Sequence, residues 1–297
     1  MIDYGRDVEF GLSIVPNVDD YPSIVESVQL ADETGFDLVG IQDHPYQRRF
    51  VDTFSLISDL AARTKHVRFF PDVANLPLRP PAVMAKMAAS IDRMAGGRFE
   101  LGLGAGGFWD AIEGMGGPRR SPAEAVESLA EAIDVVRLVW SGERNLRFSG
   151  RHYSLKGIHS GPVPAHDIGI WVGAAGPRML SLIGEKADGW VPSSGWLQLD
   201  RVPEMHERID RAAAEAGRKP TDIRRILNVG GVITEGDRGD YLVGPKSYWI
   251  EELTRLAVEL GMDTFVFWPG TAPIAQLHRF TEDVAPAVRA SVAGHRY

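Results

Sequence analysis

IGIWVGAAGPRML, residues 168–180, joins a strand, a tight turn and the start of a helix in one segment. Its first residues are mostly apolar and predict a buried strand. The small residues after them lead into a helix through Pro177, because proline is favoured in a first helical turn. A turn with so few side chains leaves backbone N–H groups free at the helix N-terminus, which suits a phosphate. Arg178 adds a fixed positive charge. The segment therefore predicts a strand–turn–helix unit with a phosphate site at its turn.

The same strand–turn–helix unit can be followed eight times along the chain. The predicted strands are nearly continuous apolar runs, which are typical of parallel strands covered on both faces. They lie at residues 8–15, 37–42, 67–74, 99–103, 168–172, 189–192, 223–229 and 264–268. The helices lie at residues 21–34, 53–64, 81–94, 122–140, 177–186, 200–216, 246–260 and 272–284. This alternation predicts an α/β fold, a (β/α)8 TIM barrel that forms a single domain over residues 1–297.

One segment interrupts the alternation of strands and helices. RNLRFSGRHYSLKG, residues 144–157, predicts a small β-hairpin that turns at Ser149 and Gly150. The hairpin would be an insertion between the predicted helix 122–140 and the predicted strand 168–172.

Composition limits the function classes. The 297 residues are 44% hydrophobic, enough for the core of one barrel. The net charge of −8 argues against a nucleic-acid partner, which usually requires a basic surface, and against an anionic membrane. The chain has no cysteine, no apolar run long enough to span a bilayer and no apolar signal-peptide core near its start. We therefore expect a cytoplasmic protein that acts on a small molecule.

The strand ends are where chemistry is expected, because barrels of this kind build their active sites at the carboxyl ends of the strands. Strand 37–42 is followed by Asp43 and His44, a carboxylate and an imidazole that suit acid–base or hydrogen-bonding chemistry. The alternative is an ordinary turn in a proline-containing loop. The position at a strand end favours a functional role.

A glycine-rich loop, GLGAGGFWD, follows the strand at 99–103. Its spacing differs from the dinucleotide-binding fingerprint, because the next predicted helix begins about 15 residues later. We instead expect its glycines to let a planar cofactor approach the backbone. These glycines are Gly104, Gly106 and Gly107. Phe108 and Trp109 are candidates for the substrate pocket, or else for the core.

Two further strand ends carry small or hydroxyl side chains. After the third strand, Val73 and Ala74 would let a flat ring approach, although the residues alone favour a proline-rich loop that starts the next helix. After the sixth strand, Ser193 and Ser194 are candidates to donate to a phosphate beside the turn at 173–176, or else form an ordinary turn. The histidines lack the spacing of a metal site, so no metal is expected.

Taken together, these motifs resemble the bacterial luciferase-like monooxygenase superfamily. The motifs are Asp43-His44, NLPLRPP at 75–81, GGRFELGLGAG at 96–106, WVGAAGPRML at 171–180 and ADGWVPS at 187–193. The resemblance covers nearly the whole chain. It implies a (β/α)8 barrel that binds FMN or the deazaflavin coenzyme F420 at the carboxyl ends of its strands.

The resemblance also implies roles for individual residues. His44 would be the catalytic proton donor or acceptor, and Asp43 would orient it or touch the cofactor ring. A non-proline cis peptide is implied near Asp72–Asn75, at Val73-Ala74. The implied cofactor-binding residues are Val73, Ala74, Asn75, Gly104, Gly106, Gly107, Ala174, Ala175, Gly176, Pro177, Arg178, Met179, Val191, Ser193 and Ser194. Phe108, Trp109 and Trp196 would line the substrate side.

Asp43-His44 and the turn at 174–177 are closer to the deazaflavin branch of the superfamily, so F420 is the first choice and FMN the second. The sugar-phosphate dehydrogenases of that branch have a glutamate where this chain has Gly107 and a lysine where it has Trp196, so their substrate is not expected. We expect an oxidoreductase that transfers a hydride to a small organic substrate. The alternatives are an FMN monooxygenase that consumes oxygen, a non-catalytic flavin- or deazaflavin-binding protein, and a metal-free hydrolase or lyase. A homodimer is common among such proteins.

Overall fold

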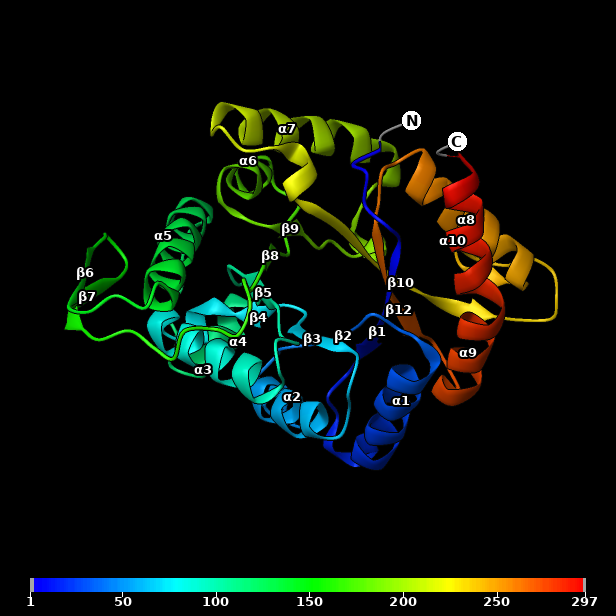
Figure 1. Cartoon of the computed structure of the whole chain (residues 1–297), viewed down its shortest axis with the longest axis horizontal. Helices are drawn as coiled ribbons and strands as arrows, with labels where there is room; N and C mark the ends of the chain where they lie inside the picture. The colour runs from blue at the N-terminus through cyan, green and yellow to red at the C-terminus, as the bar shows by residue number, and fades with distance from the viewer. Residues whose placement is uncertain (1–2, 296–297) are drawn as a thin grey trace.

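A cycle of parallel strands occupies the centre of the computed structural model, which describes residues 3–295 (Figure 1). The strands are β1 (Glu9–Ile14), β2 (Leu38–Ile41), β3 (Arg68–Pro71), β4 (Ala74–Asn75), β5 (Leu101–Gly104), β8 (Ile170–Val172), β9 (Gly189–Trp190), β10 (Arg224–Ile233) and β12 (Thr264–Pro269). Neighbours run in the order β3–β2–β1–β12–β10–β9–β8–β5–β4, and each pair is parallel. Because β4 directly follows β3 and Phe69 pairs with Phe99 ahead of β5, the sheet closes on itself. The predicted single-domain barrel is confirmed.

The helices surround this barrel on the outside (Figure 1). They are α1 (Tyr21–Thr34), α2 (Thr53–Ala62), α3 (Pro81–Met94), α4 (Trp109–Gly114), α5 (Pro122–Trp140), α6 (Pro177–Lys186), α7 (Val202–Glu215), α8 (Lys246–Val258), α9 (Pro273–Arg279) and α10 (Ala285–His295). Four of the predicted helices, those now seen as α1, α3, α5 and α6, begin and end at the predicted residues. No helix within residues 3–295 is long and apolar enough to cross a bilayer.

Local signals explain why the helices begin where they do. A proline stands at the start of α3, of α5 and of α6, where its missing N–H is not needed. Ser121 caps α5 and forms a reciprocal capping box with Glu124. The Asp52 side chain caps α2 by accepting a hydrogen bond from the Ser55 N–H. These signals lie within a few residues of each helix start, so a sequence pattern detects them.

The chain differs from the prediction in several places. The last predicted helix continues through a π-helical turn (Phe280–Val284) into α10, so Pro286 comes directly after that turn. The short helix α4 occupies the glycine-rich loop after β5. The predicted strand 67–74 is divided into β3 and β4 by a cis peptide bond between Asp72 and Val73. The implied position of that bond, Val73-Ala74, was wrong by one residue.

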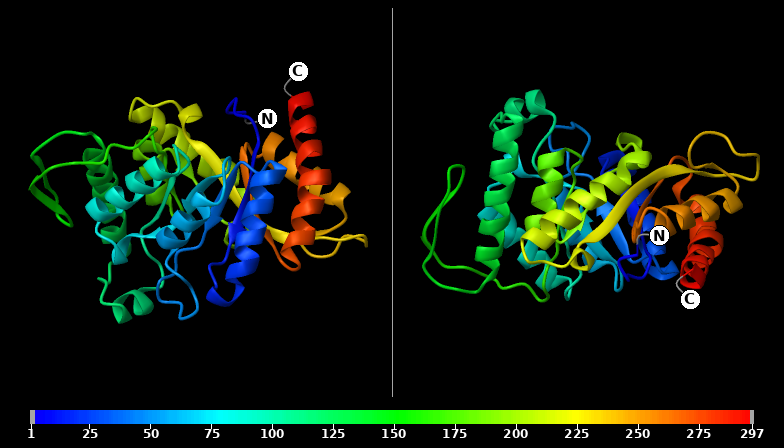
Figure 2. Two further views of the ribbon diagram at one scale, coloured as in Figure 1. Left: turned by 60° about the horizontal axis from the view of Figure 1, so that its bottom comes forward. Right: turned by 90° about the horizontal axis from the view of Figure 1, so that it is seen from above.

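The predicted hairpin is confirmed as β6 (Leu146–Ser149) and β7 (Ser154–Ile158), an antiparallel pair between α5 and β8. Figure 2 shows this green segment standing away from the barrel in two further views. The Glu131 carboxylate of α5 accepts hydrogen bonds from the backbone N–H groups of three turn residues, at 2.7–3.0 Å. The Glu131 carboxylate therefore anchors the hairpin turn to α5.

Candidate active site

One cavity, of about 870 Å³, opens at the carboxyl ends of the strands. Residues from β1, β10 and β12 and from the segments after β2, β3, β5, β8, β9 and β10 line it. The predicted site residues among them are His44, Val73, Phe108, Ala174, Ala175, Val191, Ser193, Ser194 and Trp196. The predicted residues outside the lining are Asp43, Ala74, Asn75, Gly104, Gly106, Gly107, Trp109, Gly176, Pro177, Arg178 and Met179. The barrel thus brings candidates from five separate loops to one cavity, while the others lie outside its lining.

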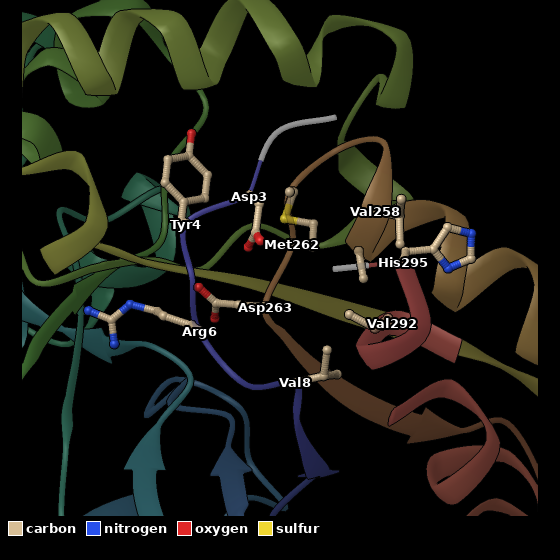
Figure 3. A pocket seen from close by; sticks show the side chains of 11 residues that line it. Asp3, Tyr4, Arg6, Val8, Val258, Met262, Asp263, Val292 and His295 are labelled. Carbon is tan, nitrogen blue, oxygen red and sulfur yellow. The ribbon is translucent and has the colours of Figure 1, made fainter. Parts of the chain in front are cut away.

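A smaller pocket lies at the opposite end of the barrel, beside the amino ends of β1 and β12 (Figure 3). Tyr4, Val8, Met262 and Val292 line it. Its volume is about 20 Å³, which is room for about one water molecule. We therefore place the candidate site in the larger cavity.

His44 follows β2 and reaches the cavity wall. Its Nδ1 atom lies 2.8 Å from the phenol oxygen of Tyr46, so Nε2 is the nitrogen left for a ligand. The Phe108 ring meets the imidazole edge to face, with centroids 5.7 Å apart. Burial lowers the pKa of His44, against a smaller opposing effect of the Asp43 charge. The imidazole is therefore neutral at pH 7, the state in which one ring nitrogen donates and the other accepts.

Tyr46 was not among the predicted site residues. Burial, and then the Asp43 charge, raise its pKa to about 12, so its phenol stays protonated at physiological pH. The only sequence signal for Tyr46 was a phenol two residues after a histidine in the same loop. A contact of this kind depends on how the loop turns.

Asp43 is buried beneath the cavity wall. One carboxylate oxygen accepts the backbone N–H of Asn75 at 2.7 Å, and Arg79 donates to both oxygens, at 2.5 and 3.0 Å. Arg79 also donates to Asp52, the cap of α2, at 2.8 Å. Through its hydrogen bond from Asn75, Asp43 links the loop that carries His44 to the segment around β4. Its charge is paired with Arg79.

Val73 projects between Gly104, at the end of β5, and Gly173, which follows β8. A Cβ atom on Gly104 would lie 2.7 Å from Val73 Cγ2, and one on Gly173 would lie 3.0 Å from the same atom. These glycines make room for the Val73 side chain. Gly104 thus faces a protein side chain in the structure, where the sequence had led us to expect a planar cofactor.

The glycine-rich loop after β5 places Trp109 away from the cavity. Gly106 has a φ of +101°, which favours glycine, and a Cβ atom there would lie 2.9 Å from the Trp109 ring and 2.8 Å from Pro77. Two aromatic residues in this loop were predicted for the substrate side. Phe108 lines the cavity. Trp109 packs against the hydrophobic core, which was the alternative prediction.

The turn at the start of α6 and the loop after β9 share one wall of the cavity. Ala174 and Ala175 line it from the turn, and Ser193 and Ser194 line it from the loop. No side chain caps the N-terminus of α6, and the Trp190 indole N–H fixes the Ala174 carbonyl at 2.7 Å. The first N–H groups of a helix have no partner within the helix, so this wall is suited to an anion.

Two polar residues in the floor of the cavity were missed by the sequence reasoning. Asn228 donates through Nδ2 to Ser193 Oγ at 3.2 Å, while its buried Oδ1 lacks a hydrogen-bond partner among the described residues. Burial raises the pKa of Asp72 to about 6, against the opposing effect of a hydrogen bond from Asn228. Asp72 directly follows the apolar strand β3, and Asn228 is a polar residue within the apolar strand β10; these were the available signals.

Comparisons with known proteins identify the family of this chain. A family model described as luciferase-like monooxygenase matches residues 8–239. A 5,10-methylenetetrahydromethanopterin reductase of Archaeoglobus fulgidus is 32% identical over 213 residues, 71% of this chain and 60% of the reductase. An F420-dependent glucose-6-phosphate dehydrogenase of Microbacterium testaceum is 30% identical over 211 residues, 67% of this chain and 61% of the dehydrogenase. The chain thus spans about three fifths of the length of these relatives.

Among solved structures, an F420-dependent secondary alcohol dehydrogenase in complex with an F420-acetone adduct superimposes with a TM-score of 0.85 at 17% identity. The superposition covers 95% of this chain and 99% of the dehydrogenase. The barrel is therefore shared over its whole length.

Proposed function

Because this chain belongs to the luciferase-like monooxygenase family, we propose that it is an oxidoreductase that binds F420 in the cavity at the carboxyl ends of its strands. One observation carries the proposal. A neutral imidazole, held through Nδ1 by Tyr46, lines the same cavity as the uncapped turn at the start of α6. Acid–base chemistry and anion binding are thereby combined in one space.

The residues present fit a flat ring with a phosphate-bearing tail. Asn228 Oδ1 is an acceptor with no protein partner, and it suits an N–H group of a ring edge. The Ala174–Ala175 turn and the hydroxyls of Ser193 and Ser194 would hold a phosphate. Val73, between its two glycines, would support the ring from below.

When bound, the reduced cofactor would supply a hydride, and the protein would orient the reactants and manage the proton. The protonated His44 would give a proton through Nε2 to the oxygen of a substrate carbonyl that accepts the hydride, and the neutral imidazole would take one in the reverse direction. Tyr46 would hold the imidazole in position. Asp43, paired with Arg79, would keep the segment around Asn75 in place and act as a positioning residue.

A second candidate is an FMN monooxygenase. Among the described residues that line the cavity there is no lysine or arginine, so a long acidic tail has no charged partner in the lining, whereas FMN ends in a single phosphate. The same turn and serines would hold that phosphate.

A titration of the purified protein with F420 and with FMN, followed by fluorescence, tests the proposal. We expect F420 to bind more tightly, and we expect His44→Ala to keep that affinity while turnover falls about 100-fold. His278→Ala, on the exposed face of α9, is the matched control and should retain both. Tighter binding of FMN would favour the monooxygenase, and binding of neither cofactor would overturn the proposal.

A further inference from the structure

Four large aromatic side chains surround the mouth of the cavity and are unusually exposed. Trp196 is 90% exposed, Phe108 60%, Trp268 45% and Tyr241 39%. They come from different places in the chain: the loop after β5, the turn after β9, the loop after β10 and the end of β12. Exposed apolar side chains gathered around one opening mark a ligand-binding surface.

The aromatic rim lies outside the part of the cavity that fits a cofactor. The cofactor-fitting groups Val73, Asn228 and Ala174 belong to the strand ends and the turns directly after them. Phe108 belongs to the rim and also contacts the His44 imidazole edge to face. The rim therefore borders the space in which a substrate would meet His44.

The charge of the lining sets a second condition on the substrate. Among the described residues, the cavity lining contains one histidine, His44, and one carboxylate, Asp72. No lysine or arginine of the described part of the chain lines it. His44 is neutral at pH 7 because burial lowers its pKa. A substrate carboxylate or phosphate at the rim would lose its water without meeting a cation, which is costly. An aromatic ring would stack on the exposed indoles and phenyl ring.

Resting on the proposed function, we infer that the substrate is an uncharged aromatic molecule, bound between the aromatic rim and His44. The rim side chains Trp196, Phe108, Trp268 and Tyr241 would then select for ring stacking, and the absence of a cation among the described residues at the rim would select against a negatively charged substrate.

Three ketones of matched shape test this inference by binding alone. They are 2-acetylnaphthalene, its anionic analogue 6-acetyl-2-naphthoate, and the saturated analogue 2-acetyldecahydronaphthalene. Calorimetry at pH 7.5, with the protein free and then saturated with its cofactor, gives a Kd for each probe. We expect 2-acetylnaphthalene to bind about tenfold more tightly than either analogue.

Substitution of Trp196 tests the rim directly, and its 90% exposure makes the substitutions compatible with folding. Trp196→Ala should weaken the binding of 2-acetylnaphthalene about tenfold. Trp196→Arg should tighten the binding of 6-acetyl-2-naphthoate, because it supplies a cation. The control is Met94→Ala, which removes a 73% exposed side chain from α3 and should change neither Kd.

The inference is overturned if the naphthoate binds as tightly as the neutral ketone, if no probe binds, or if Trp196→Ala leaves both affinities unchanged. The cofactor titration is independent of these results. Cofactor binding without the probe preference would reject the substrate class alone. The probe preference without cofactor binding would reject the proposed function and leave a neutral aromatic ligand.

Discussion

The Nδ1 atom of His44 lies 2.8 Å from the phenol oxygen of Tyr46, two residues further along the same loop. This hydrogen bond occupies one nitrogen of the imidazole and leaves the other for the cavity. A residue that fixes an imidazole determines which nitrogen reaches the substrate. Tyr46 is therefore expected to act through His44.

Tyr46→Phe removes this hydrogen bond and keeps the ring. We expect kcat to fall about tenfold, because His44 loses its fixed orientation, while the Kd for the cofactor stays the same. Steady-state kinetics and the fluorescence titration measure the two quantities. Tyr21→Phe, which loses a phenol bond to Asp59 on α2, is the control and should leave both unchanged. A normal kcat in Tyr46→Phe would show that the phenol does not position the imidazole.

The pH dependence of turnover should report His44. Burial lowers its pKa below the ordinary value of about 6.5. In the direction in which the neutral imidazole takes a proton from the substrate, turnover should therefore keep its rate as the pH falls from 8 to about 6.5, and lose it only below that value. The acid limb of kcat/KM should be absent in His44→Ala. A midpoint above 6.5 in the wild-type protein would contradict the lowered pKa.

Gly104 and Val73 form a pair that can be tested by a double-mutant cycle. A Cβ atom on Gly104 would lie 2.7 Å from Val73 Cγ2. Gly104→Ala should therefore destabilise the protein by about 1–3 kcal/mol and weaken cofactor binding. Val73→Ala removes the obstructing methyl group and should recover most of that loss in the double variant. Urea denaturation gives the free energies of unfolding. Equal effects of Gly104→Ala in both backgrounds would rule out the contact.

Asp72 should make the protein less stable at high pH. Its folded-state pKa is raised to about 6, mainly by burial, whereas the unfolded value is about 3.9. The folded state thus binds this proton more tightly, so the stabilisation from protonated Asp72 is complete below about pH 4 and is lost as the pH rises through 6. Asp72→Asn should therefore raise stability by about 3 kcal/mol at pH 8 relative to the wild-type protein.

Denaturation at pH 4 and at pH 8 measures the effect of Asp72→Asn. The difference between the variant and the wild-type protein should be larger at pH 8. An effect of the same size at both pH values would mean that the carboxyl group does not titrate in this range, and that the substitution acts through packing alone.

Much of the barrel was predictable because its signals are local. Apolar runs such as FELGL mark buried parallel strands, and Pro81, Pro122 and Pro177 mark helix starts. The helix that continues as α10 was missed because Pro286 resembles a helix end in sequence, whereas in the structure it lies directly after a π-helical turn.

The candidate site was predictable to the level of strand ends, because parallel strands bring their carboxyl ends to one face. His44, Ala174 and Ser193 lie in one cavity for that reason. The pairing of Asp43 with Arg79 depends on a loop path that no local pattern records.

The sequence by itself determined the order of strands and helices and the loops that reach the barrel mouth, since both follow from periodicity and turn chemistry. Only the tertiary structure decided that Val73 lies against Gly104 and Gly173, that Asn228 bonds Ser193, and that Trp109 packs into the core. The physical reason is that these contacts join side chains from different strands and loops. Their distances exist only once the closed sheet has set the register of each strand against its neighbours.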